Sequence, residues 1–389
     1  MNVPFLDLQA QYKSYEAEIV DKVAEFLPKQ KFILGEEVAA LEEEVARFCG
    51  TSYGIGVSSG SDALIISLMG LGISKGDVVI TTPFTFFATA GAIARLGAIP
   101  MFCDIDPVTF NIDPEKLKDL LTREIEDRGN DRIKAMIPVH LYGQCSDMND
   151  ILALANKYGI KVIEDAAQAV GTEYSTASGI KRACALGDMG ILSFFPSKNL
   201  GAFGDGGMVL TDDEAMAQEL KKLRVHGSTN KYFYETMGGN FRLDAFQAMV
   251  LRVKLRYLEK WIEGRMGKAE YYDKKFQGSG LVESGRLQFP ETVFKNSGVK
   301  YYHTYHQYVI RVQDRDNLQV FLKERGVASA IYYPLSLHQQ NCFSYLGYKT
   351  GDFPEAEKAS TEVLALPIYP ELSNEQQDYI VDSIIDFFK

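Results

Sequence analysis

At 389 residues, the chain is long enough for one large α/β domain together with a smaller one. Its 46% hydrophobic and 24% charged residues are ordinary for a globular protein, and a net charge of -11 argues against general nucleic-acid binding. No apolar run approaches the roughly 20 residues of a membrane span, and the N-terminus has no signal-like core. The five cysteines are scattered without metal-ligand spacing, which predicts free thiols in a reducing cytoplasm and no metal site.

The first 250 residues predict helices followed by a parallel sheet. Apolar residues recur at helical spacing over 15–27 and 35–48. From Tyr53 onward, short apolar strands alternate with helical stretches. The expected strands are 55–57, 77–82, 99–103, 135–138, 161–165, 191–195 and 208–210, and the expected helices are 58–71, 85–96, 114–126 and 147–158. This alternation predicts a mostly parallel sheet covered on both faces.

The C-terminal part predicts a second, smaller domain. An apolar stripe over 243–276 indicates one long helix, and such a helix often bridges two domains. After residue 280 the pattern changes. The expected elements are a strand at 308–312, a helix at 315–325, a strand at 327–333 and a closing helix at 374–388, capped by Ser373. We therefore expect a large α/β domain over 1–255, including the N-terminal helical segment, and a small α+β domain over 256–389.

A loop between the strands 191–195 and 208–210 carries a single cation, Lys198. Glycine lets a backbone approach a ligand closely, and this loop has four: Gly201, Gly204, Gly206 and Gly207. A lysine with restricted access to water loses its proton and becomes a nucleophilic amine. This stretch alone leaves two interpretations open, a nucleophile and an ordinary loop cation.

Several other polar residues follow strand ends, where open parallel sheets bind their ligands. Residues 59–62 join a strand to a helix, which suits a phosphate at the helix N-terminus but also suits a plain helix cap. Asp165 ends a buried strand, where an unpaired carboxylate is costly. It could pair with a protonated ring nitrogen of a bound ligand, or it could form a salt bridge or cap the following helix. Gln168 lies near enough to face the same ligand. Phe86 could stack on a flat ring or fill the core.

Together these residues match the needs of one cofactor, pyridoxal 5'-phosphate. A phosphate site anchors it, a lysine binds its aldehyde as a Schiff base, and a carboxylate keeps its ring nitrogen protonated. The combination is far more specific than any of its parts.

The chain resembles the pyridoxal-phosphate sugar aminotransferases of the DegT/DnrJ/EryC1/StrS group. The segments that carry the resemblance are 3–8, 32–35, 164–168, 193–198, 333–334 and position 338. The resemblance implies the aspartate-aminotransferase fold, with a seven-stranded, mostly parallel sheet in the large domain and a smaller C-terminal α+β domain.

The resemblance also implies roles for individual residues. Lys198 would form the Schiff base and later move the proton, Asp165 would pair with the pyridine nitrogen, Gln168 would bond the ring hydroxyl, and Phe86 would stack on the ring. Asn240 would complete the phosphate site of a neighbouring copy, which implies a homodimer with shared active sites. The phosphate would be bound by Gly60, Ser61, Asp62 and Ser193.

The implied reaction is a transamination from L-glutamate to a keto sugar linked to a nucleotide. Related dehydratases carry histidine in place of the lysine, so Lys198 favours aminotransfer. Residues 140–145 and 226–234 resemble members that act on 3-keto sugars, and we favour UDP-linked N-acetylglucosamine or its uronic acid, for cell-surface polysaccharide or lipopolysaccharide synthesis. Further candidates for contact with the sugar nucleotide are Lys231, Arg242, His303, His306 and His338.

Three alternatives remain open at this stage. The substrate could be a 4-keto sugar or a dTDP-linked 6-deoxy sugar. The protein could also be a regulator that binds pyridoxal phosphate without turnover. A nucleotide-binding dehydrogenase is disfavoured, because no GxGxxG motif follows the first strand.

Overall fold

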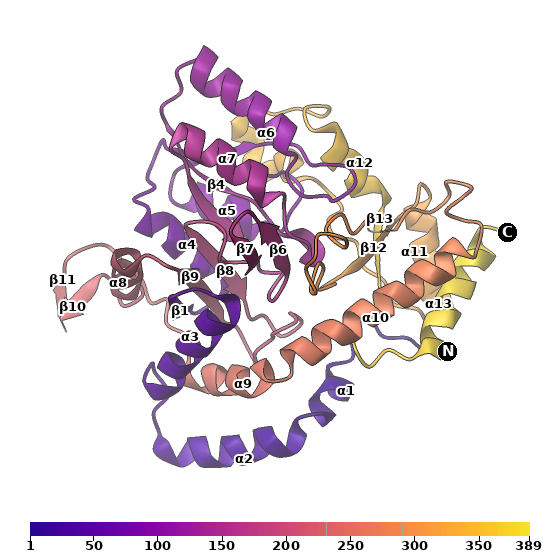
Figure 1. The fold of residues 1–389 in the computed structure, drawn as a ribbon, viewed down its shortest axis with the longest axis horizontal. Coiled ribbons are helices and arrows are strands. Elements are labelled where there is room, and N and C mark those ends of the chain that lie inside the picture. Colours follow the sequence, from indigo (N-terminus) through magenta and orange to yellow (C-terminus); the bar gives the residue numbers. More distant parts are fainter. Residues whose placement is uncertain (231, 290) are drawn as a thin grey trace.

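The computed structural model describes residues 1–230, 232–289 and 291–389. The predicted mostly parallel sheet is confirmed: seven strands lie in the order β1-β9-β8-β5-β4-β2-β3 at the centre of the larger part of the molecule (Figure 1). Only β9 runs antiparallel to its neighbours in this sheet. The strands are β1 (Tyr53–Val57), β2 (Val78–Thr81), β3 (Ile99–Phe102), β4 (Ile133–Ile137), β5 (Lys161–Asp165), β8 (Met189–Ser193) and β9 (Gly207–Thr211).

Helices cover both faces of this sheet because successive strand residues point to opposite sides. On β5, Val162 packs into one hydrophobic core and Ile163 into the other, and both are fully buried. The first core is closed by α2 (Glu16–Phe26), α3 (Glu36–Cys49), α6 (Pro114–Leu121), α7 (Met148–Tyr158) and α9 (Ala245–Leu255). The second core is closed by α4 (Gly60–Gly70), α5 (Ala88–Arg95) and α8 (Glu214–Leu223).

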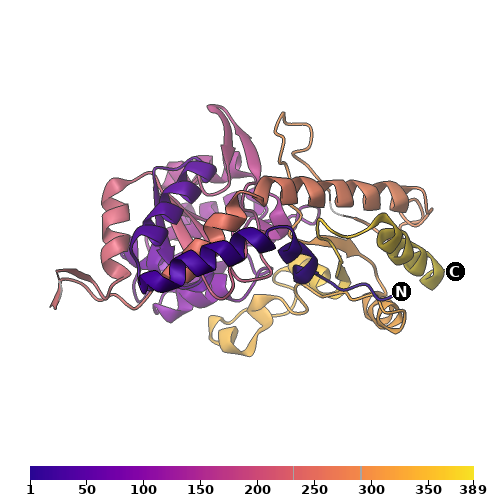
Figure 2. The ribbon, with the colours of Figure 1, turned by 90° about the horizontal axis from the view of Figure 1, so that it is seen from below.

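The C-terminal part forms its own hydrophobic core around a two-stranded antiparallel sheet of β12 (Tyr308–Arg311) and β13 (Val363–Leu366). Val3, near the N-terminus, is buried in this core, so the two chain ends lie close together (Figure 2). The predicted closing helix is confirmed, and Ser373 forms a capping box at its start. The helices here are α10 (Leu258–Gln277), α11 (Arg315–Glu324), α12 (Pro354–Glu362) and α13 (Asn374–Phe387).

The prediction of one long helix over 243–276 is wrong, since α9 and α10 are separate helices that meet at an angle (Figure 1). The Tyr257 N–H bonds to the carbonyl of Lys254, three residues back, which tightens and ends α9. Tyr257 is then held by its hydroxyl, 3.0 Å from Glu18, and by its ring, stacked on that of Trp261. The predicted domain boundary at 255/256 falls at this break and stays a prediction.

The prediction of a strand over 327–333 is also wrong. The segment makes only isolated bridges, from Val327 to Val3 and from Ala330 to Ala365, before its last residues turn toward the large sheet. The short run that became β13 was not predicted, because four apolar residues after a helix cannot be told from more helix by periodicity. Two hairpins were also not predicted: β6 (Glu173–Thr176) with β7 (Gly179–Arg182), and β10 (Ser228–Asn230) with β11 (Phe233–Tyr234).

The remaining elements are short. They are α1 (Leu8–Lys13), the 3-10 helices Leu27–Lys29, Leu141–Gly143, Leu337–Gln339 and Asn341–Leu346, and the π-helical turn Thr122–Asp127. Across the described ranges, no helix is both long and apolar enough to cross a membrane.

Candidate active site

A cavity of about 430 Å³ opens beyond the carboxyl ends of β1, β5 and β8. Its position follows from the topology, because the ends of parallel strands collect their loops at one edge of the sheet. Tyr332 and Tyr333 close it from the segment before α12. The predicted residues that line it are Gly60, Ser61, Phe86, Asp165, Gln168, Ser193, Lys198 and His306.

Lys198 lies on the loop that follows β8, and its backbone N–H donates to the Phe195 carbonyl at 2.8 Å. Burial lowers the pKa of the Lys198 amine to about 8, although the carboxylate of Asp165 acts in the opposite direction. A buried site disfavours the charged ammonium form. At pH 7 about a tenth of Lys198 is therefore in the neutral, nucleophilic form, far more than for a free lysine.

Asp165 ends β5 at the floor of the cavity and is almost fully buried. Burial raises its pKa, while a hydrogen bond from the Thr89 hydroxyl (2.9 Å) and one from the Ala167 N–H (3.2 Å) favour the carboxylate. Lys198 favours the carboxylate as well. Thr89 was not singled out from the sequence, because a threonine inside a helix gives no signal of the partner that the fold places beside it.

Two hydrogen bonds with residues of other segments hold the Gln168 side chain in one orientation. Its Oε1 accepts the Tyr142 N–H at 2.7 Å, and its Nε2 donates to the Tyr333 hydroxyl at 3.1 Å. Phe86 lies at the mouth of the cavity, 59% exposed, with its ring centroid 6.4 Å from that of Tyr333. A flat ligand could lie against the open face of Phe86.

The N-terminus of α4 meets the cavity through Ser59, Gly60 and Ser61. Asp62 does not line the cavity; its N–H donates to Ser59 Oγ at 3.0 Å and its carboxylate accepts from the Ser58 hydroxyl at 2.6 Å. A Cβ added to Gly60 would lie 2.7 Å from the Ser193 Cβ, so only glycine lets α4 approach β8 this closely. The predicted cap and the predicted anion site thus coexist, because the capped helix still presents its first amides to the cavity.

Four of the other predicted residues lie outside this cavity: His303, His338, Arg242 and Asn240. His303 is buried in the C-terminal core, where its Nδ1 accepts the Tyr305 N–H at 3.0 Å and burial lowers its pKa to about 3. His338 is buried and lies 3.0 Å from a carboxylate oxygen of Glu357. Arg242 forms a β-bridge with Val57 on the β1 strand.

Asn240 is exposed and pairs with Val225. Lys231, the remaining predicted contact, lies outside the described residues. Among the predicted sugar contacts that the structure describes, His306 is the one that lines the cavity. Its Nδ1 lies 3.3 Å from the Asn199 Oδ1, and burial holds its pKa well below the usual value.

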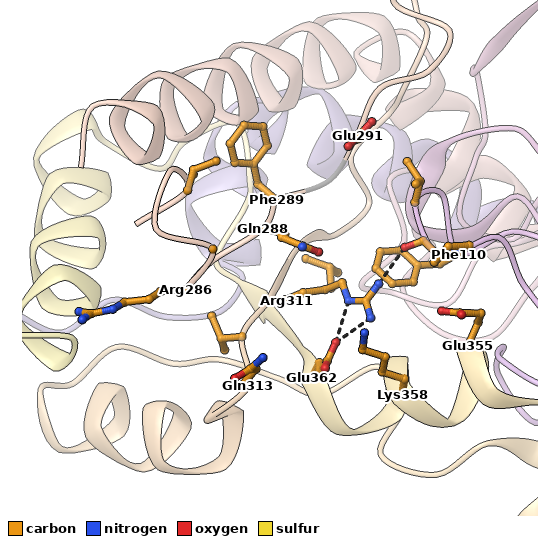
Figure 3. A pocket seen from close by; sticks show the side chains of 16 residues that line it. Phe110, Arg286, Gln288, Phe289, Glu291, Arg311, Gln313, Glu355, Lys358 and Glu362 are labelled. Carbon is orange, nitrogen blue, oxygen red and sulfur yellow. Dashed lines mark hydrogen bonds and ion pairs between the residues drawn. The ribbon is translucent and has the colours of Figure 1, made fainter. Parts of the chain in front are cut away.

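A larger hollow, of about 570 Å³, lies between β12, α12 and the loop around Phe289 (Figure 3). Its central cation, Arg311, is already engaged: the guanidinium donates to Glu362 at 2.6 Å and to the Pro107 carbonyl at 2.8 Å. None of the predicted site residues that the structure describes lines this hollow. Its size alone does not make it the active site.

The sequence model described as the DegT/DnrJ/EryC1/StrS aminotransferase family matches residues 13–385. The chain belongs to this family. Aminotransferases of the family depend on pyridoxal phosphate, so the resemblance and the predicted cofactor are both confirmed. A solved structure titled DesV of S. venezuelae in complex with a ketimine intermediate is 36% identical. It has a TM-score of 0.90 over 99% of this chain and 98% of that one, which confirms the fold.

Two curated relatives carry names of different kinds. A protein of Geobacillus stearothermophilus named "Pleiotropic regulatory protein" is 48% identical over 100% of this chain and 99% of its own length. A protein of Acidithiobacillus ferrooxidans named UDP-N-acetyl-3-dehydro-alpha-D-glucosamine 3-aminotransferase is 41% identical over 96% of this chain and 95% of its own length. The family thus includes aminotransferases of nucleotide-linked sugars as well as a member named for regulation.

The residues of this aminotransferase fit the cofactor of its family. An amine, a buried carboxylate, a flat aromatic ring and a helix N-terminus all border one cavity: Lys198, Asp165, Phe86 and the start of α4. The close approach of Gly60 to Ser193 leaves the α4 amides beside a hydroxyl, as a phosphate group requires.

Proposed function

We propose that this aminotransferase moves the amine of L-glutamate onto carbon 3 of a UDP-linked 3-keto N-acetylglucosamine or of its uronic acid. The product would supply cell-surface polysaccharide or lipopolysaccharide synthesis. The observation that carries the aminotransfer is Lys198, a partly neutral amine in the same cavity as the buried carboxylate of Asp165. The relative named for a UDP-linked 3-keto sugar, 41% identical over nearly the whole chain, supports this choice of sugar.

The residues of the cavity would divide the work. Pyridoxal phosphate, when bound, supplies an electron sink for the carbon that loses its proton. Lys198 would take and return that proton, which requires its neutral amine. Asp165 would hold a proton on the ring nitrogen, Gln168 would orient the ring hydroxyl, and the α4 N-terminus with Ser193 would bind the phosphate.

His306 would contact the sugar. Its low pKa makes it neutral at physiological pH, so one ring nitrogen can accept a hydrogen bond from a sugar hydroxyl. Asn240 would complete the phosphate site of a second copy in a homodimer; its exposure outside the cavity of its own chain supports this role. The nearby exposed apolar side chains of Phe233 and Met237, at 72% and 88%, support a partner at this end of the molecule.

A substrate panel tests the proposal. Purified protein with glutamate is offered 3-keto and 4-keto sugars on UDP and on dTDP, and each product is identified by mass. We expect amination of the UDP-linked 3-keto sugar and none with Lys198→Ala. Amination of a 4-keto or dTDP-linked sugar alone would show that the proposed substrate is wrong.

Cytoplasmic location, which the free thiols of the five cysteines support, is checked by fractionation.

A regulator that binds the cofactor without turnover is the second candidate, and the name of the relative from Geobacillus stearothermophilus favours it. The two candidates differ in a half-reaction. An aminotransferase converts its bound cofactor to pyridoxamine phosphate when glutamate is added, and the absorbance of the pyridoxal form disappears. Persistence of that absorbance at saturating glutamate would favour the regulator.

A further inference from the structure

Lys254 is a buried cation outside the cavity. It lies in the last turn of α9 with 2% of its surface exposed. Its ammonium donates a hydrogen bond to the carbonyl of Gly201, three residues after Lys198. None of the roles described above uses Lys254, although it contacts the loop that carries the reactive lysine.

The surroundings of Lys254 are aromatic. Its Nζ lies 5.7 Å, 5.8 Å and 5.9 Å from the ring centroids of Tyr15, Phe203 and Trp261. Ring faces attract a cation at such distances, which offsets part of the cost of burying it. Burial still lowers the pKa of Lys254 to about 8, and no carboxylate among the described residues counters that effect. A buried lysine without a carboxylate is rare and costs stability, so we ask what its contact with the loop does.

The loop that Lys254 contacts is tightly folded on itself. The Lys198 N–H donates to the Phe195 carbonyl at 2.8 Å, and the Ala202 N–H donates to the Phe194 carbonyl at 2.8 Å. A Cβ added to Gly201 would lie only 2.3 Å from the Pro196 carbonyl oxygen. Because one end of the loop packs directly on the other, the position of Gly201 sets the position of the residues that flank Lys198.

We propose that Lys254 is a positioning residue for Lys198: its ammonium ties the Gly201 carbonyl to α9 and so holds the loop in the conformation that presents the Lys198 amine to the cavity. Tyr15 on the N-terminal side of α2 and Trp261 on α10 enclose the contact, while Phe203 closes it from the loop itself. The proposal rests on the role proposed for Lys198.

The principal variant is Lys254→Met, which keeps an unbranched side chain in the aromatic enclosure but removes the donor. We expect kcat of the glutamate half-reaction to fall about 10- to 100-fold, since small misplacements remote from the chemistry cause losses of this size. KM for glutamate should change little, because Lys254 lies outside the cavity. Amide hydrogen exchange of the cofactor-bound protein should accelerate in peptides that cover 194–207 and stay unchanged in α4.

Two control variants separate positioning from general stability. Ile262→Val loosens packing in the same core, where Ile262 is fully buried, and should lower the melting temperature without changing kcat or exchange in 194–207. Lys260→Met removes an exposed lysine from α10 and should change neither kcat nor amide exchange in 194–207. If Lys254→Met does not fold, Phe203→Ala opens the enclosure from its exposed side and should give the same pattern with a smaller loss of kcat.

The outcomes distinguish this proposal from the proposed function. Unchanged exchange in 194–207 together with unchanged kcat in Lys254→Met overturns the positioning role, as does a fall in kcat that Ile262→Val reproduces. If the wild-type protein shows no half-reaction at all, the proposed aminotransferase function is wrong. The comparison of amide exchange still decides whether Lys254 holds the loop. Borohydride reduction followed by peptide mapping should place the cofactor on Lys198 in both wild type and Lys254→Met. A cofactor found on Lys254 would refute both assignments.

Discussion

Replacing Lys198 by methionine should make the cofactor-free protein more stable at neutral pH. In the unfolded chain the pKa of a lysine is near 10.5, whereas burial lowers the pKa of Lys198 to about 8 in the folded protein. Between these pH values the unfolded state binds more protons, so stability rises with pH. Below pH 8 the folded protein carries the full cost of a buried ammonium group, and methionine removes that cost.

The structure sets the size of this effect. The pKa of Lys198 lies about 2.5 below that of a free lysine, and 1.36 kcal/mol per pKa unit makes this about 3.4 kcal/mol as an upper value. The side chain is only partly buried, with some exposure toward the cavity, and solvent screens its charge there. We therefore expect Lys198→Met to gain about 2 kcal/mol at pH 7.

The assay is urea unfolding of cofactor-free wild type and variant at several pH values from 7 to 10. Cofactor must be removed because it would stabilise the wild type selectively. The advantage of Lys198→Met should shrink as the pH rises above about 8 and fall to less than half of its pH 7 value by pH 10, because it is lost in full only above the pKa of a free lysine, 10.5. Lys260→Met, at an exposed position, should show no such trend. A variant less stable than wild type at pH 7, or an advantage independent of pH, would refute the reasoning.

Three further substitutions test other parts of the site and fold. Thr89→Val removes a buried donor to the Asp165 carboxylate and should raise the pKa of Asp165, so the acid limb of the pH–rate profile of the half-reaction should move to higher pH; an unmoved limb contradicts this. Gly60→Ala places a Cβ 2.7 Å from that of Ser193 and should weaken cofactor binding at least tenfold, measured by equilibrium dialysis, whereas wild-type affinity would show that α4 can shift. Ser373→Ala breaks a capping box and should cost about 1 kcal/mol in urea unfolding, with kcat unchanged.

The local chemistry of this protein could be predicted from the sequence. The strand that ends at Asp165 and the loop that carries Lys198 follow from short apolar runs broken by proline and glycine, and both residues do line one cavity. The capping box at Ser373 likewise needs only neighbouring residues. In each case the interactions act over a few positions of the chain, and their pattern is visible in the sequence.

Contacts between remote segments could not be predicted. At the break between α9 and α10, Tyr257 is held by Glu18, which lies 239 positions away in the chain. The predicted strand over 327–333 does not form, and its last residues, Tyr332 and Tyr333, line the cavity instead. His303 and His306 show the same limit: three residues apart, one is buried in the C-terminal core and the other lines the cavity.

The sequence by itself thus determined which residues could do the chemistry, since amine, carboxylate and helix-cap patterns are local properties of the chain. Only the tertiary structure decided how they are tuned. The pKa of Lys198 depends on burial by distant segments, and the support that Thr89 lends to Asp165 joins residues 76 positions apart. Burial and electrostatic interaction depend on distance in space, and the fold alone sets that distance.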